Sequence, residues 1–276
     1  MWTDLDRPPL DAAALRSALV EPAGGWAALD VVTSTGSTNA DLLDAARAGA
    51  ADRTVLIAEE QVSGRGRHAR QWTSPPRAGV NLSVLLRTRG VPLDQLGWLP
   101  LLTGVAVAEA VQQIAEVPVT LKWPNDVLVH GRKLGGILAE LAATGPDPVV
   151  VVGLGLNVSL RAEELPVPTA TSLALEQSAC TDRDPVVRAV LRELARQERA
   201  WRGKAGDPVL SGLAQAYRAR CSTLGQEVLV HLPHGEELAG EAVDVDATGR
   251  LVVRDATGRT HALSAGDVTH VRSAQR

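Results

Sequence analysis

A short segment of the chain concentrates positive charge among glycines. GRGRHARQW, residues 64–72, contains Arg65, Arg67 and Arg70 and ends in Trp72. Backbone N–H groups beside glycine can form a nest for an anion, and guanidinium groups pair bidentately with phosphate oxygens. The indole offers a flat apolar face for a ring. The segment is suited to surround a phosphate, although a solvated basic loop or an arginine–glycine contact to RNA would use the same residues.

A second segment, LKWPNDVLVHGRKLGGILAE at 121–140, holds two of the three lysines in the chain. A proline-initiated turn can project Asn125 and Asp126 into a cleft, and Lys133 can enter from the adjacent strand. Lysine supplies a compact point charge, which differs from the planar fork of arginine. Gly135 and Gly136 leave room for a ligand or a neighbouring backbone. The alternative is a surface hairpin in which Asn and Asp only form the turn.

Two further segments place polar groups at the ends of elements. GSTNAD, residues 36–41, puts Ser37, Thr38 and Asn39 at a helix entrance, which suits a carbonyl, ureido or carboxylate group. Plain helix capping would use the same residue types. In GLGLNV, residues 153–158, a strand ends in glycines and Asn157. This is no dinucleotide fingerprint, because no third glycine opens a helix.

The elements that must position these segments alternate between strands and helices. A short helix is expected within 8–20, with Asp11 as its N-cap, and amphipathic helices within 184–203 and 207–221. Strands are expected at 54–61, 79–87, 119–123, 126–129 and 134–141, and a further β-branched run lies within 147–160. Hairpin signals among them favour an α+β fold over a doubly wound parallel sheet.

The pattern of apolar and polar residues changes near residue 221. From there the chain shows short strands with period-two patterning and repeated turns, and DATGR occurs twice, starting at Asp246 and at Asp255. We interpret the two copies as equivalent loops. The tail predicts a small β-barrel of the SH3-like or OB-like size class. We therefore expect a larger domain at 1–220, which carries the segments described above and whose residues 1–30 form a helical extension, and a C-terminal β domain at 221–276.

Composition excludes several classes of protein. A formal charge of −4 argues against bulk electrostatic binding of nucleic acid or anionic membrane. Cys180 and Cys221 lie in no metal-ligand spacing, so neither a zinc site nor a disulfide framework is expected. The N-terminus lacks the charge pattern of a signal peptide. No apolar run is expected to reach the length of about 20 residues that is needed to cross a bilayer. These observations predict a cytoplasmic protein.

The segments taken together are more specific than any one of them. The order GSTN, EEQxxGRGRxxRxW, KWPNDV, RKLGGILxE, GLGLNV resembles the catalytic core of biotin protein ligases, from about residue 33 to about residue 175 with ATSL at 170–173. The β tail resembles the C-terminal domain of that family. The resemblance implies a central mixed β-sheet flanked by helices, of the kind found in class II aminoacyl-tRNA synthetases and biotin ligases, followed by an SH3-like β-barrel.

Enzymes of that family are ATP-dependent carbon–nitrogen ligases. They form biotinyl-5′-AMP from biotin and ATP, release pyrophosphate, and pass the biotinyl group to one lysine of a biotin carboxyl carrier protein domain, such as that of acetyl-CoA carboxylase. The resemblance therefore implies biotin and ATP as substrates, with Mg²⁺ on the phosphates and no metal ligand from the protein. From the acidic balance we expect no nucleic-acid or membrane partner, and exposed edge strands would allow a monomer or weak homodimer.

The resemblance, together with the charge and proton transfer that such a reaction requires, assigns site residues. The catalytic set is Lys133, Arg67, Arg65 and Asp126. The biotin-binding set is Ser37, Thr38, Asn39, Gln61, Gly64, Arg65, Gly66, Arg67, Lys133 and Gly136. The set that binds ATP and the adenylate is Arg67, Arg70, Trp72, Asn125, Lys133 and Asn157.

The chain departs from the family pattern in two places. Family loops commonly read GRGRxGR, whereas Ala69 stands here at the later glycine, which would cost about 1 kcal/mol if that position requires positive φ. Only about 30 residues precede the core, fewer than the roughly 50 of a small domain, so no DNA-binding repressor role is expected. The alternatives are a lipoate-protein ligase, whose RRxSGGGxVxH pattern is missing, and a nucleic-acid-binding module, which the scarcity of Tyr and Phe disfavours.

Overall fold

The computed structural model describes residues 7–232, 236–264 and 266–270. Its centre is a seven-stranded sheet in the order β1-β2-β5-β9-β8-β7-β6. β1 and β2 are parallel and every other neighbouring pair is antiparallel, so the sheet is mixed. The strands are β1 Ala28–Val32, β2 Thr54–Ala58, β5 Gly79–Arg87, β6 Val119–Lys122, β7 Asp126–Val129, β8 Arg132–Ala143 and β9 Val149–Asn157.

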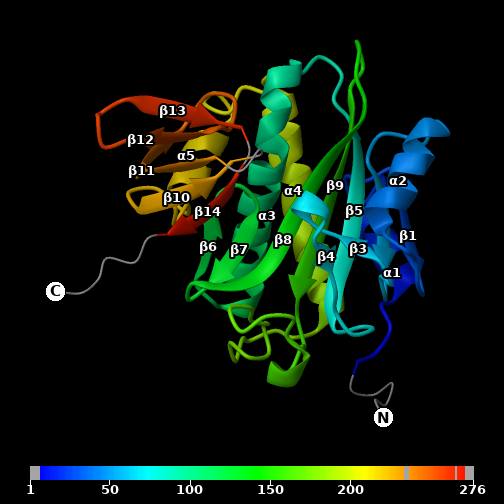
Figure 1. Cartoon of the computed structure of the whole chain (residues 1–276). Coiled ribbons are helices and arrows are strands. Elements are labelled where there is room, and N and C mark those ends of the chain that lie inside the picture. Colours follow the sequence, from blue (N-terminus) through cyan, green and yellow to red (C-terminus); the bar gives the residue numbers. More distant parts are fainter. Residues whose placement is uncertain (1–6, 233–235, 265, 271–276) are drawn as a thin grey trace.

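Helices cover both faces of this sheet (Figure 1). The helix α2 packs on one face against β5 and β9, whereas α3 and α4 pack against each other on the opposite face. The α-helices are α1 Ala12–Leu19, α2 Thr38–Arg47, α3 Trp98–Ala115, α4 Arg183–Arg202 and α5 Leu213–Arg218. Short 3-10 turns occur at Arg67–Ala69 (η1), Leu93–Gly97 (η2) and Ala162–Glu164 (η3).

The two faces of β5 and β9 have different chemistry. Alternate residues of a strand point to opposite faces. In β9 the even-numbered residues Val150 to Leu156 join the large core with α3 and α4, whereas Val149 and Val151 cluster with Leu42 of α2. The remaining positions on the α2 side of β9 are glycines and Asn157. The side of the central strands that faces α2 therefore becomes small and polar along their length.

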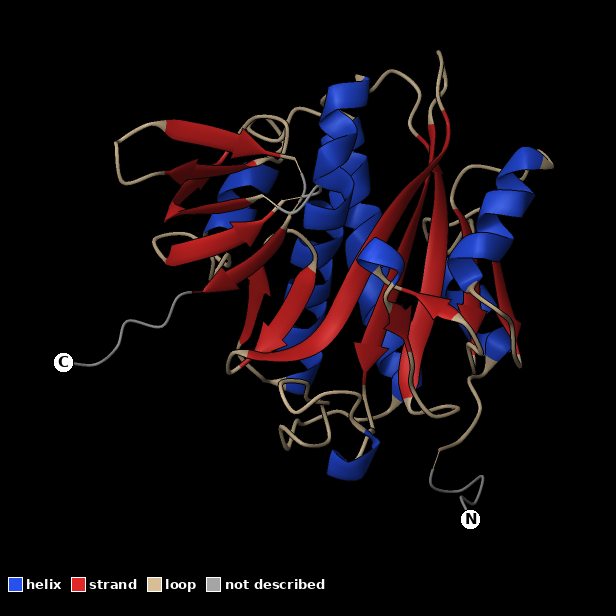
Figure 2. Cartoon of the chain, viewed as in Figure 1, coloured by secondary structure: helices blue, strands red, loops and turns tan. Residues whose placement is uncertain are grey.

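The C-terminal part forms a second sheet, which lies beside α3 (Figure 2). It is antiparallel in the order β13-β12-β11-β10-β14. Its strands are β10 Glu227–His231, β11 Glu237–Val245, β12 Leu251–Arg254, β13 Thr260–Leu263 and β14 Asp267–His270. The indole nitrogens of Trp98 and Trp123 donate to Ala247 O and Gly249 O in the loop after β11, which attaches this sheet to the larger one. The predicted α+β fold is confirmed.

The two DATGR copies form equivalent turns, as predicted. Asp246 Oδ1 accepts from the N–H and the hydroxyl of Thr248 at 2.9 Å each, and from Arg250 N at 3.0 Å. Asp255 Oδ1 makes the same contacts with Thr257 and Arg259. In each copy the aspartate side chain holds the turn that joins two strands.

Other local predictions are confirmed with changed bounds. Asp11 caps α1 by accepting from Ala14 N, as predicted. α5 begins only at Leu213, because Asp207 Oδ1 first accepts from the two N–H groups of Val209 and Leu210 and forms a turn there. The glycines of GLGLN were expected at the end of a strand, but they lie inside β9.

The segment Leu93–Ala115 corrects the expectation that no apolar run is long enough to cross a bilayer. By length and composition it could cross a membrane, yet 72% of its apolar window is buried inside the protein. Gly104 in its middle lies close to side chains of Leu121 and Ile137 from the sheet. The segment thus packs as the central core helix, and its apolarity follows from burial on several sides.

Candidate active site

The arginine-rich segment folds into a small β-hairpin. β3, Gly64–Arg65, pairs with β4, Gln71–Trp72, and η1 lies between them. Gly66 N donates to Arg70 O at 2.7 Å and closes the turn. Within this turn a left-handed backbone occurs at His68, with φ of 53°. The positive φ that was considered for Ala69 is therefore found one residue earlier, at His68.

Two elements outside the hairpin hold its arginines. Arg67 Nη1 donates to Asn125 Oδ1 at 3.2 Å and to Gly266 O at 3.4 Å. The guanidinium of Arg70 pairs with the carboxylate of Asp267 at the start of β14. Burial lowers the pKa of Arg67 from its ordinary value, and Asp267 opposes this effect, so the side chain stays a cation at neutral pH.

Arg65 has a different environment. Its side chain is 53% exposed, and its guanidinium lies 3.9 Å from the carboxylate of Glu140 on β8. An exposed cation on a hairpin can move toward a ligand at small cost, because solvent screens the partner that it leaves. Arg65 is therefore available to a ligand in the neighbouring cavity.

The KWPND turn places an amide and a carboxylate beside the hairpin, as predicted. Asn125 follows β6, and its Nδ2 donates to Ile137 O at 3.1 Å on β8. Asp126 opens β7 and accepts from Lys133 Nζ at 2.5 Å. Lys133 comes from the adjacent strand β8, where its N–H donates to Thr169 O at 2.8 Å. The lysine is thus held both by its backbone and by its side chain.

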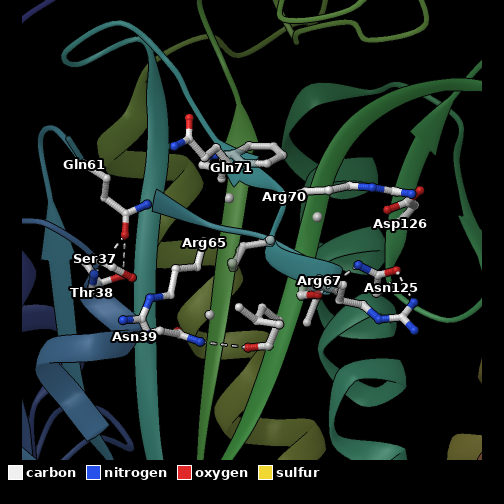
Figure 3. Close-up of a pocket in the computed structure, with 18 of the residues that line it drawn as sticks. Ser37, Thr38, Asn39, Gln61, Arg65, Arg67, Arg70, Gln71, Asn125 and Asp126 are labelled. Atoms are coloured by element: carbon white, nitrogen blue, oxygen red, sulfur yellow. Dashed lines mark hydrogen bonds between the residues drawn. The ribbon is translucent and has the colours of Figure 1, made fainter. Parts of the chain in front are cut away.

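The entrance of α2 is capped from outside the helix. Ser37 occupies the N-cap position but its side chain makes no capping hydrogen bond. Thr38 N donates instead to Gln61 Oε1 at 2.8 Å, and Figure 3 shows this bond from the segment before the hairpin. Capping by the GSTNAD hydroxyls, the alternative considered from the sequence, is therefore wrong. Ser37 is one of the residues that line the cavity.

Glycines on the central strands make room for the side chains of the site. A Cβ at Gly153 would lie 2.2 Å from Asn39 Oδ1, and one at Gly155 would lie 2.2 Å from Trp72 Cε2. Real Cβ atoms do not approach so closely, so only glycine fits while these side chains keep their places. The indole Nε1 of Trp72 donates to Asn81 Oδ1 at 3.0 Å on β5, which fixes the ring over the sheet.

These segments surround one cavity (Figure 3). The predicted site residues that line it are Ser37, Thr38, Asn39, Gln61, Arg65, Gly66, Arg67, Arg70, Trp72, Asn125, Asp126, Lys133 and Gly136. Its lining also includes residues that the sequence analysis did not select, namely Gln71, Leu82, Ile137, Leu138, Gly153, Leu154, Gly155 and Asp267.

The structure does not bring two predicted residues into this lining. Asn157 is buried at the end of β9, where its Nδ2 donates to Thr171 O at 2.9 Å. That bond ties β9 to the ATSL segment, which in turn contacts the backbone of Lys133. Gly64 lies just behind the lining, and a Cβ there would approach Trp72 O to 2.4 Å. Both positions support the site from behind its wall.

Among the described residues, no group of three or more His, Cys, Asp and Glu side chains is arranged to hold a metal ion. The charged groups around the cavity are three arginines, one lysine and two aspartates. Such an arrangement can bind and orient anions, and it leaves Asp126 as a carboxylate near any acyl or phosphoryl group held by Lys133.

Comparisons with known proteins agree with this geometry. Residues 30–157 match the Biotin/lipoate A/B protein ligase family, and residues 223–271 match the Biotin protein ligase C terminal domain. The biotin--[acetyl-CoA-carboxylase] ligase of Mycobacterium tuberculosis is 49% identical over 98% of this chain and 100% of its own length. The protein of the same name from Paracoccus denitrificans is 30% identical over 81% of this chain and 93% of its own length.

A solved structure gives the same result in three dimensions. The biotin protein ligase from Aquifex aeolicus in complex with biotin and ATP superposes with a TM-score of 0.72 at 28% identity. The alignment covers 90% of this chain and 100% of that chain. The similarity extends over almost the full length of the chain, the fold is shared, and the motifs lie around one cavity. The chain belongs to the biotin protein ligase family.

Proposed function

We propose that this protein joins biotin to ATP, forming biotinyl-5′-AMP and pyrophosphate, and then transfers the biotinyl group to a lysine of a biotin carboxyl carrier domain. The observation that supports this most strongly is the single cavity shared by the GRGR hairpin, the KWPND turn and Lys133. The 49% identity with a ligase over almost the entire chain supports the same activity. The residue roles below are parts of this proposal.

The first step joins two anions. A biotin carboxylate oxygen attacks the α-phosphorus of ATP, a C–O–P linkage forms, and the bond to the departing pyrophosphate breaks. Because a carboxylate is ionised at neutral pH, no general base is required. Positive charge and alignment are required, since the reactants repel each other. Arg65, Arg67 and Lys133 supply the charge, and Arg70 binds the phosphates after exchanging Asp267 for them.

The remaining residues divide between the two substrates. The first turn of α2 and Gln61 hold the ureido ring of biotin, and Trp72 with Asn125 lies on the adenosine side. Asn157 acts on that side indirectly, because its side-chain amide is already bonded to Thr171 O. The biotin-binding residues are Ser37, Thr38, Asn39, Gln61, Gly66 and Gly136, together with the cations.

The second step requires loss of a proton. The incoming lysine amine, with an ordinary pKa of about 10.4, attacks the acyl carbon; the amide bond forms as the acyl–phosphate bond breaks, and AMP leaves. Asp126 is the carboxylate placed to receive the proton of that amine. Its Oδ1 accepts from Lys133 Nζ at 2.5 Å. As Lys133 turns to the linkage between acyl group and phosphate, Asp126 becomes free to accept another N–H.

Mg²⁺ belongs to this proposal as an ion brought in on the ATP phosphates. Phosphate oxygens and water would satisfy its preference for oxygen ligands, as in many nucleotide enzymes. When bound, it neutralises charge on the departing pyrophosphate. The residues of the chain contribute to the same end through the three arginines and Lys133, which line the cavity.

We also propose the organisation in which this chemistry takes place. Residues 1–220 form the catalytic domain and residues from 221 the C-terminal domain, because α5 ends at Arg218 and the next strand, β10, already belongs to the second sheet. The C-terminal domain contributes Gly266 and Asp267 to the hairpin contacts. The partner is the carrier domain of a biotin-dependent carboxylase. Action in the cytoplasm as a monomer or weak homodimer, without nucleic acid, completes the proposal.

Pyrophosphate release tests the proposed function. Biotin should drive release from ATP in the presence of Mg²⁺, lipoate should not, and added RNA should change nothing. A carrier domain should then gain one biotinyl group on one lysine, detected as a mass increase. Release driven by lipoate and absent with biotin would replace this function by that of a lipoate-protein ligase.

Replacement of Gly155 by alanine is expected to raise the KM for ATP roughly tenfold or more. The new Cβ would lie 2.2 Å from Trp72 Cε2, so the indole must shift. Overpacking of this kind costs about 1–3 kcal/mol, and 1.4 kcal/mol corresponds to a factor of ten. Initial rates of pyrophosphate release at varied ATP give the constant, and a thermal melt reports whether the fold is intact. An unchanged KM in a folded variant would show that Trp72 does not serve the nucleotide.

A further inference from the structure

Two polar side chains outside the lining of the cavity connect to residues that line it. Ser83 lies on β5 with no exposed surface, and the Glu140 side chain on β8 is 28% exposed. Neither lines the cavity itself. Asn39 Nδ2 donates to Glu140 Oε2 at 2.7 Å, and Ser83 Oγ donates to Asn39 Oδ1 at 2.6 Å. Ser83 Oγ also lies 2.7 Å from Thr38 Oγ1, so four side chains form one chain of hydrogen bonds.

Glu140 sets the orientation of the Asn39 amide. Asn39 is buried, and its two amide protons point at two acceptors, Glu140 Oε2 at 2.7 Å and Leu138 O at 3.2 Å. The reversed amide would place an oxygen against a carboxylate and a carbonyl, which repel it. Asn39 therefore has no proton left for a ligand and presents only the remaining lone pair of Oδ1.

The number of available protons also determines where the hydroxyl of Thr38 donates. An amide oxygen cannot donate, so the short contact with Asn39 Oδ1 uses the single proton of Ser83. The 2.7 Å contact between Ser83 and Thr38 must then use the proton of Thr38. A competing contact from Thr38 Oγ1 to Gln61 Oε1 is longer, at 3.1 Å, and Gln61 Oε1 already accepts from Thr38 N. Thr38 is thus left with lone pairs facing the cavity.

We infer that Ser83 and Glu140 are positioning residues that make this wall of the cavity accept hydrogen bonds and donate none. The wall then selects a ligand that presents N–H groups. This inference rests on the proposed function, and it explains a preference within a family that handles both biotin and lipoate. The ureido ring of biotin carries two N–H groups, whereas the dithiolane ring of lipoate carries none.

The physical reason for selection is the cost of leaving buried acceptors unpaired. A site built around hydrogen bonds to a substrate N–H rejects analogues without it far more strongly than an apolar pocket rejects a missing methylene. Suitable probes are two cyclic carbamates of biotin, each with one ureido N–H replaced by oxygen. The wild-type protein should use at least one of them about 100-fold less well than biotin, measured as kcat/KM for pyrophosphate release.

Variants separate this role from a merely structural one. Ser83→Ala releases the Thr38 proton, which can then donate to the carbamate oxygen. Glu140→Gln offers a side-chain amide that tolerates either orientation of Asn39. The specificity ratio is kcat/KM for biotin divided by kcat/KM for the rejected carbamate. Each variant should lower this ratio about tenfold, and its effect on biotin should appear in KM. Thr88→Val is a matched control, because it removes a buried hydroxyl that donates to Pro148 O beyond the far end of the same strand.

The outcomes are distinct. Simple loosening of the site would lower kcat/KM for both compounds and leave their ratio at the wild-type value, which overturns the inference. Equal use of biotin and both carbamates by the wild-type protein also overturns the inference. This measurement needs no variant, so it tests the inference even if a variant does not fold. Absence of any biotin-dependent pyrophosphate release from the wild-type protein would instead overturn the proposed function, and the inference with it.

Discussion

Replacement of Lys133 by glutamine is expected to lower the rate of biotinyl-adenylate formation about 10²- to 10³-fold. A preorganised charge aimed at a developing anion has an effect of that size in enzyme active sites. Lys133 is the lysine that lines the cavity, and two backbone hydrogen bonds to the 169–171 segment hold its strand position. Glutamine keeps a similar length and removes the charge. Biotin-dependent exchange of labelled pyrophosphate into ATP gives the rate.

Lys204→Gln is the matched control for this prediction. Lys204 is exposed just after α4, so loss of its charge should leave the exchange rate within about a factor of two of wild type. Lys133→Arg should also be slow, since a planar fork does not replace a compact ammonium group. Exchange at the wild-type rate in Lys133→Gln would mean that the arginines alone align the two anions.

Replacement of Asp126 by asparagine should affect the second half-reaction most. Transfer from isolated biotinyl-5′-AMP to a carrier domain is expected to slow about 10²-fold or more, the usual size of a general-base contribution. Adenylate formation should change only a few-fold, because the asparagine oxygen can still accept from Lys133 Nζ, as Asp126 does at 2.5 Å. The two half-reactions are measured separately, the first by pyrophosphate exchange and the second by mass spectrometry of the carrier.

Asp30→Asn provides the control for loss of a carboxylate. Asp30 forms an exposed ion pair with Arg16 on the far edge strand β1, and such pairs contribute little. Its transfer rate should match wild type. If Asp126→Asn transfers biotin at the wild-type rate, the proton of the incoming lysine leaves by another route. If both half-reactions slow equally, Asp126 serves mainly to hold Lys133.

The sequence was sufficient to predict which residues of its contiguous motifs line the cavity. Arg65, Arg67 and Trp72 come from one hairpin. Asn125 lies in the turn before β7, and Asp126 and Lys133 lie on the adjacent strands β7 and β8, so local spacing already places them together. Asp11 and the two DATGR turns were predictable for the same reason, since their hydrogen bonds span only a few residues.

Residues joined by long-range pairing were harder to predict. Asp267 reaches Arg70 across 197 positions of sequence, and no local pattern announces that contact. Gln61 caps a helix that begins at Thr38, so the polar cluster at that entrance was interpreted as its own cap. Asn157 shares a motif with site residues, yet its amide is consumed by Thr171 behind the wall.

The strand at 79–87 carries a further signal for the cavity. GVNLSVLLR is a buried strand whose only polar side chains before its final arginine, Asn81 and Ser83, are two residues apart and therefore on one face. The glycines at 153 and 155 of the neighbouring strand follow the same alternation. Small and polar residues on one face of otherwise apolar central strands predict a cavity there, because an apolar core would leave Asn and Ser unpaired.

The most direct test of the whole account is a crystal structure of the protein with biotin and a non-hydrolysable ATP analogue. The biotin carboxylate and the α-phosphate should lie within hydrogen-bonding distance, about 3 Å, of the Lys133 ammonium and the Arg67 guanidinium, with the ureido ring against Thr38 and Asn39. Both ligands bound elsewhere, with Arg67 still bonded to Asn125 and Lys133 to Asp126, would contradict it.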